Sequence, residues 1–174
     1  MKKQKGFTLI ELLIVIAVLG VLAVALLAAL DPLEQIKKAN DTGIRNTVTE
    51  IQAAFTRYYA VKSGVMPWGI TGTLTWMSIG QGGGSAFSYL TSVIETGELK
   101  SDFATIAGSN LEKIYLTGYS TTNDSKITAC YQPTSKSFKS DPNTKYGTSG
   151  AANGTIGTVS GCGLATSSCF WCVQ

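Results

Sequence analysis

The chain has 174 residues, 14 of them Lys or Arg and 11 Asp or Glu, which gives a formal net charge of +3. Lysines at positions 2, 3 and 5 account for this whole excess, so the remainder has no basic surface of the kind that binds nucleic acid. Histidine is absent, which excludes Ser-His-Asp hydrolysis and His-based metal chemistry. No paired-carboxylate motif is present, and the sequence predicts neither enzymatic activity nor a cofactor.

An uninterrupted apolar segment occupies most of the first thirty residues. Residues 12–30 contain no charged or polar side chain. Counted from Phe7, the segment would extend about 36 Å as a helix at about 1.5 Å per residue, enough to cross a bilayer core of about 30 Å. The lysines before it predict a cytoplasmic amino terminus. An ordinary cleaved signal peptide is the main alternative, but its apolar core would be shorter and would end in an Ala-x-Ala-like site.

Glu11 lies near the amino-terminal end of this apolar segment. A carboxylate at the centre of a membrane helix costs about 2.5–3.5 kcal/mol, and less near an end. An ionisable residue in such a place therefore indicates a function and a positive partner. The alternative is a plain signal anchor, in which the Glu11 side chain merely reaches the lipid headgroups.

Residues 5–11, which read Lys-Gly-Phe-Thr-Leu-Ile-Glu, closely resemble the class III signal of type IV pilins and pseudopilins. The resemblance is specific over residues 5–30 and loose elsewhere. It implies that prepilin peptidase cuts between Gly6 and Phe7 and methylates the new amino terminus of Phe7. It also implies a cleaved leader (residues 1–6), a transmembrane and filament-core helix (residues 7–30) and an extracellular globular head (residues 31–174).

The resemblance further implies how such a subunit would assemble. The precursor crosses the cytoplasmic, or inner, membrane once, and a platform protein and an ATPase lift subunits into a cell-surface helical homo-oligomer. Glu11 would pair with the Phe7 ammonium of a neighbouring copy and so set the stagger between helices, because a wrongly staggered helix would bury the carboxylate alone. Gly20 and several Ala residues would permit close helix packing. The filament surface would then contact a surface, another cell, extracellular DNA, or nothing.

Four cysteines lie outside the apolar segment: Cys130, Cys162, Cys169 and Cys172. An even number in an exported domain predicts two disulfides, with three connectivities to choose from. We expect Cys130–Cys172, tying an interior strand to the last one, and Cys162–Cys169, closing a small loop. A zinc site and a Cys-x-x-Cys redox motif at Cys169 and Cys172 are the alternatives.

A second helical segment is expected from Asp31-Pro32 to about Gly64, and Asp31-Pro32 is equally compatible with a helix start and with a kink in one continuous helix. Its apolar residues recur at intervals of three and four and form a stripe that should pack on a sheet. The stripe consists of Ile44, Val48, Ile51, Phe55 and Tyr58, extended backwards by Ala39 and Ile36. The segment Asp41-Thr42-Gly43 is a candidate weak point, because the apolar segment has Gly20 but lacks the Pro that many type IV pilins carry there.

The rest of the head is expected to be one short helix followed by strands. The helix covers residues 86–96, with Ser85 as its cap and Gly97 at its end. Residues 80–84 predict a surface loop, since the glycines fit no nucleotide fingerprint. The β portion begins at about Lys113, with strands at 113–119, 126–131 and 169–173 and a further one at 136–139; residues 147–161 predict a loop.

Together these patterns predict an α+β, type IV pilin-like fold, in which a long amino-terminal helix packs its second half on a small antiparallel sheet. The expected function is that of a structural subunit, a major pilin. Two alternatives stay open: a pseudopilin of a type II secretion or DNA-uptake system, and a membrane-anchored surface protein that never polymerises.

Overall fold

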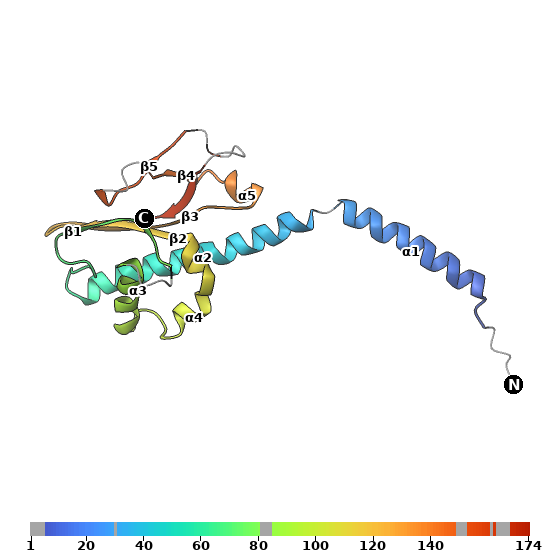
Figure 1. The fold of residues 1–174 in the computed structure, drawn as a ribbon, viewed down its shortest axis with the longest axis horizontal. Coiled ribbons are helices and arrows are strands. Elements are labelled where there is room, and N and C mark those ends of the chain that lie inside the picture. Colours follow the sequence, from blue (N-terminus) through green and yellow to red (C-terminus); the bar gives the residue numbers. More distant parts are fainter. Residues whose placement is uncertain (1–5, 30, 81–84, 149–152, 161, 163–167) are drawn as a thin grey trace. The chain divides into compact units, whose positions relative to one another are not determined.

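The computed structural model describes residues 6–29, 31–80, 85–148, 153–160, 162 and 168–174 (Figure 1). The chain divides into two compact units, residues 1–36 and 37–174, and each is considered by itself. The first holds the apolar helix α1 (Leu9–Ala29), and the second holds the sheet and most of α2 (Pro32–Val61). The fold is α+β and pilin-like, as the sequence predicts.

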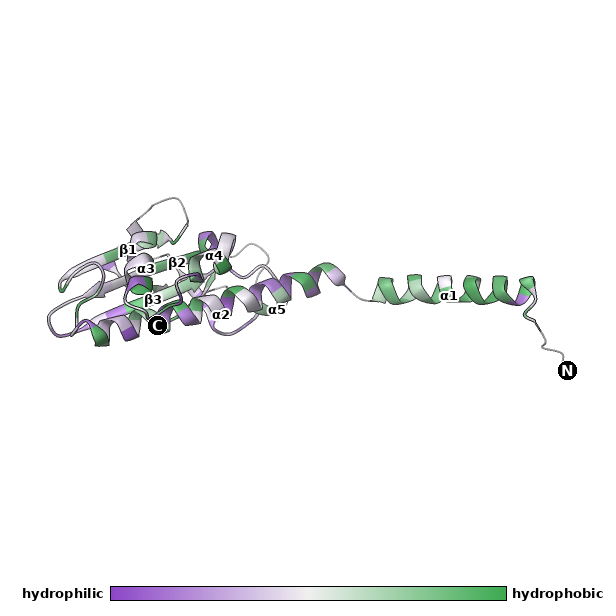
Figure 2. Ribbon diagram, turned by 90° about the horizontal axis from the view of Figure 1, so that it is seen from below, coloured by the Kyte–Doolittle hydropathy of each residue, from purple (hydrophilic) through white to green (hydrophobic). Residues whose placement is uncertain are grey.

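Helix α1 buries none of its side chains. It is apolar on all sides, and Figure 2 shows this hydropathy continuing along its length. A helix that is apolar all round belongs in lipid or among other helices, since water would solvate it poorly. Within the described part of the chain, α1 is the one helix that is long and apolar enough to cross a membrane, judged by length and composition.

Helix α2 begins after Asp31, whose carboxylate accepts a hydrogen bond from the Glu34 amide at 3.2 Å. Pro32 occupies the first turn, where its missing N–H costs nothing. The five-residue stripe from Ile44 to Tyr58 is buried, as predicted. The backward extension of the stripe is wrong: Ile36 is 58% exposed and Ala39 is exposed, because the burial of α2 begins only at Asp41.

Within the described residues, six strands form one antiparallel sheet that packs on the buried face of α2. The strands are β1 (Gly72–Ser78), β2 (Ile114–Ser120), β3 (Ser125–Tyr131), β4 (Thr144–Gly147), β5 (Gly157–Thr158) and β6 (Phe170–Val173). Their order is β1-β2-β3-β6-β4-β5, so the last strand inserts between β3 and β4. The strand that is last in sequence is therefore central in the sheet.

The segment between β1 and β2 completes the core. It forms α3 (Ser85–Glu95), α4 (Phe103–Ala107) and a 3-10 helix (Gly108–Lys113). Leu90 and Val93 of α3 and Phe103 of α4 belong to the same buried cluster as the α2 stripe. In Figure 1, α3 and α4 lie on the same side of the sheet as α2. The predicted helix at 86–96 is confirmed within one residue, and Gly97 follows it with a φ of 82°.

The late start of the β portion is wrong, because β1 precedes α3. The pairing of β1 with β2 is interrupted by a bulge between Leu74 and Met77. The bulge breaks the alternation of residues between the two faces of the sheet, which makes β1 hard to recognise in the sequence. The strand β4 was also not predicted from the sequence.

Residues 136–139 form helix α5 (Lys136–Lys139) instead of a strand. The Ser135 hydroxyl caps α5 by accepting a hydrogen bond from the Phe138 amide, and this local bond competes with strand formation.

The expected loop at 147–161 contains the short strand β5, which is held by pairing with β4. Residues 149–152 and 161 lie outside the described residues, as do 81–84 of the expected glycine loop.

Gly154 lies directly against the backbone of β2 at Gly118 and Tyr119. It has a φ of 73°, and an added methyl group would overlap the carbonyl oxygen of Gly118. We expect Gly154→Ala to lower the free energy of unfolding by about 1–3 kcal/mol, because it combines a strained backbone with a clash. Urea unfolding of the full chain in detergent micelles measures this. Gly43→Ala on α2 is the matched control: it meets no atom within 4 Å and should leave stability unchanged or slightly raise it.

Candidate processing and assembly site

Thr8 and Glu11 are hydrogen-bonded to each other at the start of α1. Glu11 Oε2 accepts hydrogen bonds from the Thr8 amide at 2.8 Å and from the Thr8 hydroxyl at 2.7 Å. In return, the Glu11 amide donates to Thr8 Oγ1 at 3.3 Å. This reciprocal pair is a capping box, which satisfies backbone donors that the first turn of a helix leaves without partners. The capping box was not predicted, although its sequence pattern, Thr-x-x-Glu ahead of an apolar run, is present.

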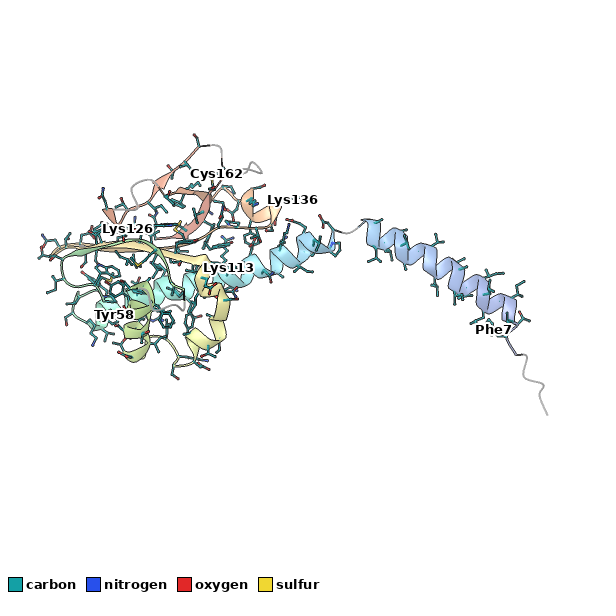
Figure 3. The ribbon with its side chains drawn as sticks, viewed as in Figure 1. Phe7, Tyr58, Lys113, Lys126, Lys136 and Cys162 are labelled. Atoms are coloured by element: carbon teal, nitrogen blue, oxygen red, sulfur yellow. A yellow bond between two sulfur atoms is a disulfide. The ribbon has the colours of Figure 1, made fainter. Side chains whose placement is uncertain are left out.

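The capping box places the expected cleavage site outside the helix. Helix α1 begins at Leu9, so Gly6 and Phe7 precede it in an exposed, irregular stretch (Figure 3). A protease needs an accessible, non-helical backbone, and Gly6 and Phe7 are both exposed and both precede α1. Gly6 adds no side chain to obstruct that approach, and no atom lies within 4 Å of the position its Cβ would take.

The capping box also leaves half of the Glu11 carboxylate available. Both bonds from Thr8 end on Oε2, and Oε1 accepts no hydrogen bond from any described residue. Glu11 can therefore cap its own helix and still accept a bond from a second, positively charged group. Local capping and pairing between subunits are thus compatible roles for the same side chain.

The cysteines form the two expected pairs. Cys130 and Cys172 are disulfide-bonded and stand opposite each other in the ladder between β3 and β6. Cys162 and Cys169 form the second disulfide, seven residues apart in sequence. Since Cys169 and Cys172 belong to different bonds, they do not act as one Cys-x-x-Cys redox pair. No group of three potential metal-ligating side chains occurs among the described residues.

A family model for the prokaryotic N-terminal methylation motif matches residues 1–27. The chain carries the class III prepilin signal of type IV pilins and pseudopilins. This prepilin signal implies processing by prepilin peptidase and assembly into a pilus-type structure, and the family it marks is structural. No curated protein and no solved structure matches the chain. The match covers the prepilin signal and most of α1, so the head must be interpreted from its own residues.

A second polar site, which the sequence reasoning did not identify, joins α2 to the chain after β3. The carboxylate of Asp41 is completely buried. Its Oδ2 accepts hydrogen bonds from the amides of Ser135 at 2.7 Å and Thr134 at 3.0 Å, and its Oδ1 accepts one from the Thr134 hydroxyl at 2.9 Å. The position of Asp41 in the sequence was the signal for this site: it lies three residues before Ile44 and seven before Val48, and therefore on the apolar face of α2. Helix α2 is continuous across the predicted weak point at 41–43.

Arg45, one turn further along α2, connects the helix to the last strand. Its guanidinium carbon lies 4.2 Å from the centre of the Trp171 ring on β6, and its Nη1 lies 3.2 Å from Asp141 Oδ2. Tyr131 packs against Trp171, with 5.7 Å between ring centres. Burial raises the pKa of the Tyr131 hydroxyl above its usual range, the negative charge of Asp41 raises it further, and Arg45 opposes both. The tyrosine therefore stays neutral, and these contacts hold α2 against β6 and against Asp141.

Proposed function

We propose that this chain is a structural subunit, the major pilin, of a type IV pilus. The observation that carries the proposal is a fully exposed apolar helix that directly follows a class III prepilin signal and is capped by Glu11. Such a helix is stable only in a bilayer or packed among other apolar helices. The same segment therefore serves as a membrane anchor before assembly and as the filament core afterwards.

Cleavage between Gly6 and Phe7 would create a positively charged amine just before α1. In a filament, the Phe7 ammonium of one copy would donate to Glu11 Oε1 of a neighbouring copy, while Thr8 keeps Oε2 occupied. Because both charges must lose water to pair, the contact contributes more to the choice of stagger than to net stability. Residues 1–6 would be removed, residues 7–30 would form the core, and residues 31–174 would form the exposed head.

The head would face outward, where its two disulfides suit an oxidising environment. We propose no enzymatic activity and no cofactor for it. The precursor would reside in the cytoplasmic membrane, with a platform protein and an ATPase driving assembly. A pseudopilin of a secretion or DNA-uptake system carries the same signal and is the second candidate, distinguished by forming only short or scarce fibres.

Amino-terminal analysis of sheared surface fibres tests the proposal. Mass spectrometry should find this chain as the dominant component, beginning at N-methylated Phe7 and lacking residues 1–6. Surface material that begins at Met1, or that begins after residue 30, would contradict both processing and the filament core. Correctly processed chain that remains in the membrane fraction, with fibres rare or absent, would favour the pseudopilin.

A further inference from the structure

A groove of about 350 Å³ lies on the head between α2 and α4. Gly43 and Thr47 of α2 form one wall, and Phe103, Ile106 and Ala107 of α4 form the floor and the other wall. All of these residues belong to the unit of residues 37–174. The groove is thus a feature of the head itself.

The α4 side of this groove is apolar, and polar side chains of Thr47, Glu50, Lys100 and Asn110 complete the lining. Gly43 has no side chain, and no atom lies within 4 Å of its Cβ position, so another chain can approach the α2 backbone there. The Thr47 hydroxyl donates to the Gly43 carbonyl at 3.0 Å and is engaged within its own helix. Phe103 and Ala107 are largely buried, but Ile106 is 72% exposed at the rim. Covering Ile106 would remove a large apolar side chain from water, which favours an apolar occupant.

Charges of opposite sign flank the groove. Glu50 extends the α2 wall, Lys100 lies before α4, and both are exposed. An occupant that fits should therefore present apolar side chains with a basic residue beside them, placed to meet Glu50. Charge complementarity of this kind selects the orientation of a partner more than it adds affinity.

The same chain contains a segment with this chemistry, in the first two turns of α2. Leu33 is 68% exposed and Ile36 is 58% exposed, and their spacing of three puts them on one face of the helix. Lys37 and Lys38 follow directly and are exposed. We call residues 33–38 the leading turns of α2.

We propose that the leading turns of α2 in one copy bind in the α2–α4 groove of a neighbouring copy. Leu33 and Ile36 contact Phe103 and Ile106, and Lys37 pairs with Glu50. The two surfaces differ, so the contact is heterologous and repeats into an open helical assembly instead of closing a dimer. This inference rests on the proposed filament function and adds a second contact to the bundling of α1.

Cysteine pairing within filaments tests the contact directly. The double variant Ile36→Cys with Ile106→Cys should yield a ladder of disulfide-linked subunits when sheared filaments are run on a non-reducing gel. Each single variant should yield no ladder. The matched control combines Ile36→Cys with Ile70→Cys, because Ile70 is similarly exposed (54%) but lies outside the groove. Filaments that form normally without the ladder, or with an equal ladder in the control, overturn the inference and leave the proposed function intact.

A charge exchange covers the case in which the cysteine variants fail to assemble. Lys37→Glu and Glu50→Lys should each lower filament yield by about fivefold. The double exchange should restore the yield, because it again places opposite charges at these two positions. A double variant as poor as the single ones overturns the inference. Wild-type chain that never forms filaments overturns the proposed function itself, so the two failures are distinguishable.

Discussion

Replacing Glu11 by alanine is expected to abolish surface filaments while cleavage between Gly6 and Phe7 continues. The scissile bond lies outside α1, so the peptidase should still reach it. Without the carboxylate, a neighbouring Phe7 ammonium has no partner in the apolar core and the stagger between helices is no longer selected. We expect filament yield to fall by at least about tenfold, which corresponds to about 1.4 kcal/mol or more per subunit contact. Immunoblots of sheared and membrane fractions, with mass spectrometry of the amino terminus, measure both quantities.

Two further variants separate the roles of this side chain. Glu11→Gln keeps an oxygen that accepts from Thr8 but removes the charge, and Thr8→Val keeps the charge but removes the hydroxyl of the capping box. If pairing between subunits matters most, Glu11→Gln should resemble Glu11→Ala, and Thr8→Val should retain most filaments. If capping matters most, Glu11→Gln should retain most filaments and Thr8→Val should resemble Glu11→Ala. Normal filament yield from Glu11→Ala would remove Glu11 from assembly altogether.

Replacing Asp41 by alanine is expected to destabilise the head by about 3 kcal/mol. The substitution leaves the Ser135 amide, which belongs to a fully buried residue, without its acceptor and also removes the acceptors of the Thr134 amide and hydroxyl. Each buried donor that loses its partner costs about 1–3 kcal/mol. Urea unfolding of the full chain in detergent micelles, followed by tryptophan fluorescence, reports on the head because Trp68, Trp76 and Trp171 all lie there.

Asn40→Ala is the matched control for Asp41, because it changes the preceding residue of the same helix at an exposed position. It should alter the free energy of unfolding by less than about 0.5 kcal/mol. Asp41→Asn keeps one oxygen as an acceptor but turns an N–H₂ toward the donors, so an intermediate loss is expected. An Asp41→Ala variant as stable as the control would show that the chain after β3 does not depend on α2 for its attachment.

The elements that were predicted correctly are those whose signal is local. The apolar run, the α2 stripe from Ile44 to Tyr58 and the helix ending before Gly97 each follow from residue spacing within one segment. The prepilin signal is equally local, which explains why residues 5–11 sufficed to indicate processing. The capping box was also within reach, since Thr8 and Glu11 are only three positions apart.

The elements that were missed depend on partners far away in sequence. The strand β1 is hidden by its bulge, and β5 is only two residues long and exists through its pairing with β4. Residues 136–139 were predicted as a strand, but the Ser135 cap and the docking of the preceding residues on Asp41 favour a helix. The role of Asp41 was not predicted, because its hydrogen-bond donors lie more than 90 residues later in the sequence.

The amino-acid sequence by itself determined the apolar helix, the prepilin signal, the amphipathic helix α2 and the presence of two disulfides, because helix periodicity and motif spacing act over a few residues. Only the tertiary structure decided that β6 inserts between β3 and β4, which sets Cys130 opposite Cys172, and that Asp41 and Arg45 hold α2 against the segment after β3 and against β6. The physical reason is that strand order and buried polar pairs depend on segments brought together by burial of a common core, and no local pattern specifies which distant segments will meet.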